Sequence, residues 1–208
     1  MILSYSPGAG KSYFMLEKGA QQLKLGKKVL VGFLFERHRK SDVDNIGGMK
    51  IAYNREKNIY NISEILEEKP DVVLMDELGV SFKDKMGNVR FVYEDVERLI
   101  DEGIDVYTTV NLKKFQGIND EFKKLSGIGV RKQIPIKFLE MADKIFFIDR
   151  DEKLLIKDFN SNDLFRERYM KSKIMNKNFS EKTLEKYRKL SYKILENYKE
   201  KLEVIERN

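Results

Sequence analysis

The chain has 208 residues, a net charge of +6, no cysteine, no tryptophan and one histidine. Without cysteine there is no disulfide, cysteine-ligated zinc, iron–sulfur cluster or thiol nucleophile, and one histidine argues against a histidine-dependent triad or a multi-histidine metal site. Charges of both signs are interspersed, which indicates a solvated surface rather than a nucleic-acid-binding stripe. Apolar runs are far shorter than the ~18 residues needed to span a bilayer, and no secretory signal is present, so we expect a cytoplasmic protein.

From residue 1 to about 150, short apolar runs alternate with segments of helical periodicity. Strands are expected at 2–5, 28–35, 49–53, 71–75, 104–110 and 144–148, with a weaker candidate at 130–134. Helices are expected at 12–25, 61–68, 92–101, 119–125 and 136–141. Strands separated by single helices predict an α/β fold in which helices flank a mostly parallel sheet.

Residues 181–207 have a different character. Apolar and small residues recur there at steps of three or four, with charged residues between them, and Ser180 precedes the segment. This pattern predicts one amphipathic helix whose apolar face either docks on the domain or supports self-association. The expected organisation is an α/β domain at 1–150 and, in the same domain, a helical C-terminal extension at 151–208.

A glycine-rich turn lies between the first expected strand and the first expected helix. Gly8 and Gly10 would let backbone N–H groups converge on a phosphate, Lys11 would reach the β- and γ-phosphates, and the Ser12 hydroxyl would hold Mg²⁺. The pattern G-x-x-x-x-G-K-[ST] wants glycine where this chain has Tyr5, so the match is incomplete, and an ordinary βα turn is the alternative. We expect ATP and Mg²⁺ as cofactors, bound by Pro7, Gly8, Ala9, Gly10, Lys11 and Ser12.

The expected strand 71–75 is followed by two carboxylates. Asp76 is placed to join Ser12 in the Mg²⁺ shell, and Glu77 is the candidate catalytic residue, which would orient an attacking water. Two acids that cap a strand at the surface are the alternative. The sequence therefore indicates nucleotide binding more strongly than turnover.

The strand at 104–110 also ends in polar residues. Ligands bind beyond the carboxyl ends of strands in open α/β sheets, so Thr109 and Asn111 are expected to face a phosphate or its water. Thr108 equally suits a strand for its β-propensity alone. Arg37, His38 and Arg39 fit a solvated basic turn better than an anion contact.

Several blocks of the sequence resemble the N-terminal cytoplasmic sensory domain of the KdpD family, the sensor kinases that control high-affinity potassium uptake in bacteria. The most specific is 93–111, YEDVERLIDEGIDVYTTVN, which is similar to the family's W-Q-D-V-E-E-L-L-x-A-G-I-D-V-Y-T-T-V-N; the others are 7–17, PGAGKSYFMLE, and 72–78, VVLMDEL. The resemblance covers about residues 2–195. It implies a P-loop NTPase-like fold, ATP binding, and a sensor kinase or response regulator as protein partner.

Some segments depart from the family pattern. Residues 79–92 lack the family's two histidines, and 35–39 keeps the composition of the family's E-T-H-G-R with a slip of about one position. His38 lies at a strand end and not on a dimerisation helix, and the chain has no room for a separate catalytic domain. We therefore expect no histidine kinase core, in either a free-standing sensory domain or a piece of a longer sensor kinase.

Three functions follow from these observations. The first is an ATP-binding regulatory module in two-component signalling linked to potassium or osmotic status. The second is a slow P-loop ATPase in which Glu77 positions water. The third is an interaction module with a degenerate loop, acting through 181–207.

Overall fold

The computed structural model describes residues 1–35, 47–54, 56–57, 59–83, 89–127, 129–161 and 179–207. Within these residues seven strands form one sheet, in the order β11-β10-β1-β9-β6-β2-β3. The pairs β2–β3, β2–β6, β6–β9 and β10–β11 are all parallel. The expected α/β class with a mostly parallel sheet is confirmed. The chain divides into two compact units, one of residues 1–2 and 12–110 and one of 3–11 and 111–208.

The first unit contains two strands, β2 and β6, that are buried along their whole length. Its elements are α1 (Lys11–Lys24), β2 (Val29–Phe33), β3 (Lys50–Ile51), β4 (Tyr53–Asn54), β5 (Ile59–Tyr60), α3 (Ile62–Glu67), β6 (Val72–Met75), β7 (Ser81–Lys83), β8 (Val89–Phe91), α4 (Val92–Asp101) and β9 (Asp105–Asn111). Every residue of β2 and β6 is buried, as their continuous apolar sequences require. Asn61 caps α3 by accepting a hydrogen bond from the Ser63 N–H.

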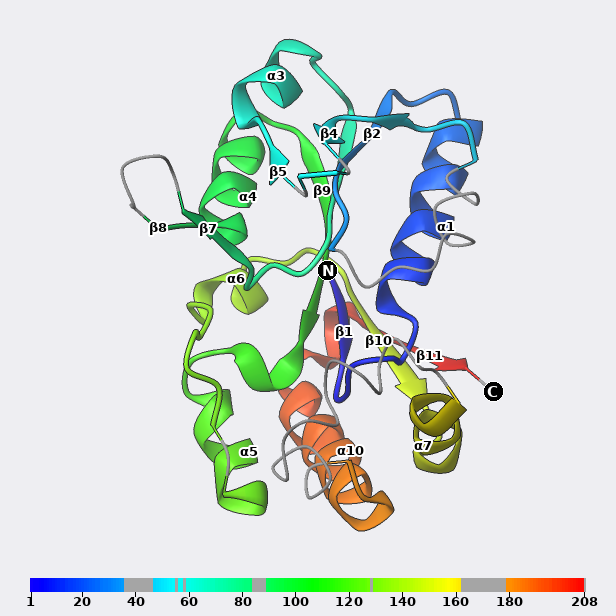
Figure 1. Ribbon diagram of the computed structural model, residues 1–208, viewed down its shortest axis with the longest axis vertical. Helices are drawn as coiled ribbons and strands as arrows, with labels where there is room; N and C mark the ends of the chain where they lie inside the picture. The colour runs from blue at the N-terminus through cyan, green and yellow to red at the C-terminus, as the bar shows by residue number, and fades with distance from the viewer. Residues whose placement is uncertain are drawn as a thin grey trace. The chain divides into compact units, whose positions relative to one another are not determined.

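Two glycines show how closely the helices and strands of this unit approach one another. A Cβ at Gly19 of α1 would lie 2.6 Å from Leu74, whereas a Cβ at Gly32 of β2 would lie 2.7 Å from both Val73 and Met75. Leu74 and its two neighbours point to opposite faces of β6, since side chains alternate along a strand. Figure 1 accordingly shows α1 on one side of β2 and β9 and α4 on the other.

The second unit contains β1 (Ile2–Ser4, whose first residue belongs to the other unit) and the loop that follows it. Its other elements are the 3₁₀ turn η1 (Leu112–Lys114), α5 (Ile118–Ser126), α6 (Lys137–Glu140), β10 (Ile145–Arg150), α7 (Glu152–Ser161), α10 (Glu181–Leu195), the 3₁₀ turn η2 (Glu196–Lys201) and β11 (Leu202–Arg207). The buried side of α10 includes Leu184 and Tyr187, and the Tyr187 ring packs against Phe122 of α5 at 5.1 Å between centroids. Figure 1 shows α5 and α10 side by side. Docking of this helix is confirmed, while self-association through 181–207 stays a prediction.

The expectation of one helix over 181–207 is wrong beyond residue 195. Leu202–Arg207 is strand β11, which pairs in parallel with β10 from Ile145↔Leu202 to Arg150↔Arg207. Leu202 and Ile205 fit the helical spacing, but the β-branched Val204 and Ile205 also suit a strand, and pairing with β10 decides between the two. The C-terminal extension is therefore not wholly helical.

Two smaller strand expectations also differ from the structure. The candidate strand 130–134 contributes only an isolated bridge between Phe115 and Ile134, and Pro135, which has no N–H, follows at once. The expected strand 49–53 is divided into β3 and β4 on either side of Ala52. The hairpin pairs β4–β5 and β7–β8 are not expected from the sequence pattern.

Gly32→Ala should destabilise the protein. The added methyl group would overlap Val73, whose branched side chain has little rotamer freedom, so we expect a loss of about 1–3 kcal/mol. Urea unfolding followed by circular dichroism measures the change. Lys50→Ala, at an exposed position of the adjacent strand β3, should change stability by only about 0.5 kcal/mol. A Gly32 variant as stable as the Lys50 variant would contradict the tight packing described here.

Candidate functional site

The loop between β1 and α1 has the backbone conformation that its glycines suggest. Gly8 and Gly10 have φ of +82° and +95°, values in the left-handed region that glycine adopts without steric cost. Lys11, which is buried, is the first residue of α1, and the first turn of this helix contains no acidic residue. The positive end of the helix dipole is therefore not neutralised within its own first turn, which suits an anion.

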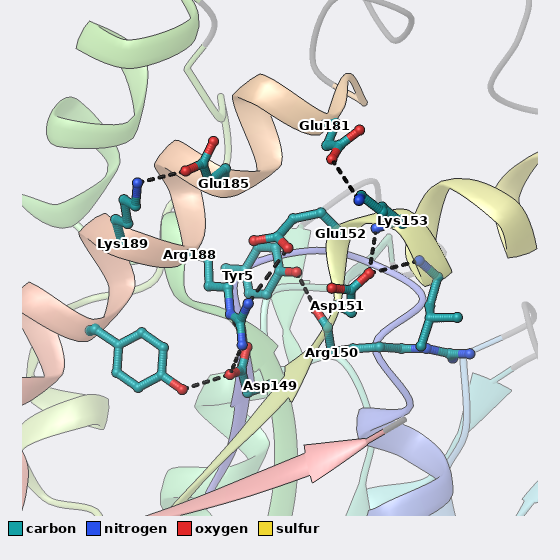
Figure 2. Close-up of polar contacts among 12 residues, drawn as sticks. Tyr5, Asp149, Arg150, Asp151, Glu152, Lys153, Glu181, Glu185, Arg188 and Lys189 are labelled. Carbon is teal, nitrogen blue, oxygen red and sulfur yellow. Dashed lines mark hydrogen bonds and ion pairs between the residues drawn. The ribbon is translucent and has the colours of Figure 1, made fainter.

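Tyr5 stands where the phosphate-loop pattern wants glycine, and the structure explains why the pattern can be relaxed there. Among the described residues, the only non-glycine residues with positive φ are Lys69 and Glu77, so the backbone at Tyr5 needs no glycine. The Tyr5 side chain is fully buried, and its hydroxyl donates a hydrogen bond to the Arg150 carbonyl oxygen, as Figure 2 shows. Burial raises the pKa of Tyr5. Tyr5 is thus a core residue beneath the loop.

Asp76, directly after β6, is the centre of a polar cluster in the first unit. One of its carboxylate oxygens, Oδ1, accepts hydrogen bonds from the Ser12 hydroxyl at 2.8 Å and the Thr109 hydroxyl at 2.6 Å. The other, Oδ2, accepts from the Phe35 N–H at 3.1 Å. Asp76 is 1% exposed and Thr109 is fully buried. The structure therefore brings together three of the residues that the sequence analysis singled out, namely Ser12, Asp76 and Thr109.

Glu77 follows with an unusual backbone. Its φ is +51°, a conformation that non-glycine residues rarely adopt and that costs of order 1 kcal/mol or more. The Glu77 N–H donates to the Thr109 hydroxyl oxygen at 3.0 Å, and the Leu78 N–H donates to the Thr109 carbonyl at 2.9 Å. Thr109 thus holds both the Asp76 carboxylate and the strained turn that presents Glu77.

The remaining predicted residues have other surroundings. Asn111 is buried, and its side-chain oxygen accepts a hydrogen bond from the Lys113 N–H at 3.2 Å, so it caps η1. Arg37, His38 and Arg39 lie outside the described residues, as do residues 84–88 of the divergent segment 79–92.

The donor set fits magnesium bound together with a nucleotide. Ser12 and Asp76 offer a hydroxyl and a carboxylate, the hard oxygen ligands that Mg²⁺ prefers. No group of three or more His, Cys, Asp or Glu side chains that could hold a metal occurs in the part of the chain that the structure describes. Mg²⁺ in nucleotide sites usually has few protein ligands and completes its shell with phosphate oxygens and water, which a hydroxyl and one carboxylate suit.

A second polar cluster, in the other unit, was not anticipated as a cluster. Asp149 is 2% exposed and makes a two-pronged ion pair with Arg188 of α10, at 2.7 Å to Nε and 2.6 Å to Nη2 (Figure 2). The Tyr192 hydroxyl donates to the same carboxylate at 2.6 Å, and Arg188 also lies 3.5 Å from Glu152. Burial, with the hydrogen bond to Asp149, raises the pKa of Tyr192 to about 12. This cluster holds α10 against β10.

Thr109→Val should destabilise the protein by about 1–3 kcal/mol, because the Glu77 N–H loses its acceptor and Asp76 loses a donor in a buried site. Chemical unfolding measures this. Thr108→Val is the matched control: the buried Thr108 hydroxyl has no hydrogen-bond partner among the described residues, so its removal should be neutral or stabilising. Equal losses in the two valine variants would contradict the role given to Thr109.

Asp149→Asn should cost about 2–4 kcal/mol, since it leaves Arg188 beside a neutral side chain in a partly buried position. Thermal unfolding at neutral pH provides the measurement. Lys189→Ala, which removes an exposed helical pair with Glu185, should cost about 0.5 kcal/mol or less. If Asp149→Asn unfolds at the same temperature as the parent protein, the cluster does not stabilise α10.

Comparison with known proteins adds independent information. The family described as the osmosensitive K⁺ channel His kinase sensor domain, KdpD, matches residues 1–197. Sensor protein KdpD of Clostridium acetobutylicum is 31% identical over an alignment of 182 residues, which covers 82% of this chain and 20% of that protein. The putative sensor protein KdpD of Synechocystis is 31% identical over 157 residues (72% and 42%), and sensor protein KdpD of Escherichia coli is 30% identical over 149 residues (68% and 17%).

The chain spans less than half the length of each of these relatives. A solved structure, the signal recognition particle receptor FtsY from Elizabethkingia anophelis, aligns with 80% of this chain and 46% of its own at 13% identity and a TM-score of 0.30, a similarity too low to support an argument. In the described residues, no helix is long and apolar enough to cross a membrane.

Proposed function

Because the chain belongs to the KdpD family of osmosensitive K⁺ channel His kinase sensor domains, we propose that it is an ATP-binding regulatory module in two-component signalling linked to potassium or osmotic status. Its partner would be a histidine kinase core or a response regulator, since we assign the phosphotransfer chemistry to another polypeptide or segment. Because the chain resembles the cytoplasmic sensory domain of KdpD proteins, we propose that the module acts in the cytoplasm.

The observation that carries the nucleotide proposal is the Asp76 cluster. A buried carboxylate that accepts hydrogen bonds from Ser12 of α1 and Thr109 of β9 supports a magnesium-binding role for this position. Bound ATP·Mg²⁺ would supply the phosphate oxygens that complete the metal shell. The N–H groups of Gly8 to Ser12 would bind phosphate, and Lys11 would balance its charge as a point cation.

A specific observation also favours slow ATP hydrolysis as a second candidate. Glu77 is kept in a strained conformation at the end of β6, and strained backbone at a strand end is typical of positions whose side chain has a task. Its carboxylate would orient water toward the terminal phosphate or accept its proton. ATP hydrolysis and regulation are compatible, because slow hydrolysis can set how long a signalling state lasts.

Lys11→Ala should weaken ATP binding by about tenfold to a hundredfold, the usual contribution of a hydrogen bond to a charged group. Isothermal titration with ATP and Mg²⁺ measures the affinity, and circular dichroism verifies folding. Lys24→Ala, at the exposed end of the same helix, removes the same charge and should leave affinity unchanged. The proposal fails if the parent protein does not bind ATP or if both variants bind it equally well.

The hydrolytic candidate has a separate test. Phosphate release should exceed the buffer rate and fall by at least about tenfold in Glu77→Gln, which keeps the size of the side chain and removes its basicity. The hydrolytic candidate fails if phosphate release does not exceed the buffer rate or is the same in Glu77→Gln. The protein would then bind ATP without hydrolysing it.

A further inference from the structure

The strand that the sequence analysis missed ends beside the phosphate loop of its own unit. β11 pairs in parallel with β10, and the last pair in the register is Arg150↔Arg207. The carboxyl ends of parallel neighbours lie at the same edge of a sheet, where α/β proteins bind ligands. Two arginines are thus presented together at this edge.

The Arg207 side chain lies next to Gly10 of the phosphate loop. A Cβ placed on Gly10 would be 3.5 Å from the Cδ atom of Arg207, 3.8 Å from Nη1 and 3.9 Å from Nε. The guanidinium group is therefore in van der Waals range of the position that a side chain at Gly10, the residue directly before Lys11, would occupy. Because Gly10 has no side chain, no Gly10 atom beyond the backbone lies between the loop and the Arg207 guanidinium.

Arg150 has a different role, although it is the register partner of Arg207. Its Nη2 forms an ion pair with Asp158 at 2.6 Å, and its Nη1 is 3.4 Å from the Gly8 carbonyl oxygen. Its own carbonyl accepts the Tyr5 hydroxyl bond. The Asp158 carboxylate offsets the charge of Arg150, and the contact with the Gly8 carbonyl oxygen lets Arg150 hold the loop in place. Arg150 is therefore a positioning residue.

We propose that Arg207 is a phosphate-binding residue of the nucleotide site, supplied by β11. The proposal rests on the proposed function and deepens it by adding a cation that lies outside the glycine-rich motif. A guanidinium presents several donors in a planar fork and binds phosphate oxygens in pairs, which a lysine cannot do. Lys11 and Arg207 would then share the charge of the phosphates, one from each end of the chain.

A consequence follows for β11 itself. It stands at the end of the strand order, and its residues are only partly buried or exposed, so few apolar contacts hold it in place. A ligand that binds Arg207 in the paired strand stabilises that strand by mass action, and the paired strand in turn strengthens ligand binding. Nucleotide binding would therefore stabilise the pairing of β11 with β10.

The test combines affinity with hydrogen exchange on the full chain. Arg207→Ala should weaken binding of ATP·Mg²⁺ by roughly tenfold in isothermal titration, and Arg207→Lys should recover part of the loss. ATP should slow amide exchange in Leu202–Arg207 of the parent protein and not in Arg207→Ala. Lys199→Ala removes the same charge from an exposed position of η2 and should behave as the parent protein in both measurements.

The outcomes separate the two proposals. If the parent protein binds no ATP, the proposed function and the role of Arg207 both fail. If the parent binds ATP and Arg207→Ala binds it equally well, or if ATP leaves exchange in β11 unchanged, only the role of Arg207 is overturned. The lysine variant keeps the test valid if alanine unfolds the C-terminal strand, because retained charge without the fork should still reduce affinity.

Discussion

The first unit depends on one buried carboxylate. A carboxylate is costly to remove from water unless hydrogen bonds replace its hydration, and Asp76 accepts such bonds from the Ser12 and Thr109 hydroxyls and the Phe35 N–H. The donors come from the start of α1, the residues after β2 and the end of β9, so a single side chain ties together segments far apart in the sequence. Their relative positions at this edge are fixed by the need to satisfy that charge, and the apolar packing of β2 and β6 behind it keeps water away.

The local features of the site could be predicted because they depend on short stretches of sequence. Glycines before a lysine at a strand–helix junction, and acids after an apolar strand, specify their own surroundings through backbone freedom and strand direction. Thr109 was only half predictable: its position at a strand end was visible, but its contact with Asp76 depends on β6 and β9 being neighbours. The position of Asn111 at the strand end was visible as well, but its capping hydrogen bond with the Lys113 N–H depends on the turn that follows.

The C-terminal strand could not be predicted for a different reason. Leu202 and Ile205 satisfy a helical spacing, and nothing within the segment excludes the helix. Its conformation is decided by the partner available on β10, which lies more than fifty residues earlier in the chain. Arg207 was consequently invisible as a candidate, because no local motif links it to Gly10. A local sequence motif cannot identify a residue that comes to a site only because two distant segments of the chain pair.

The left-handed backbone at Glu77 has an implication for how this sequence balances stability against chemistry. Glycine would adopt φ of +51° without the steric cost that a Cβ imposes, so the most stable residue for this turn is not the one that the chain carries. A stability-driven redesign would replace Glu77 early and would lose a carboxylate beside Asp76. The turn is thus a place where the sequence accepts a less stable backbone in order to keep an acid at the end of β6.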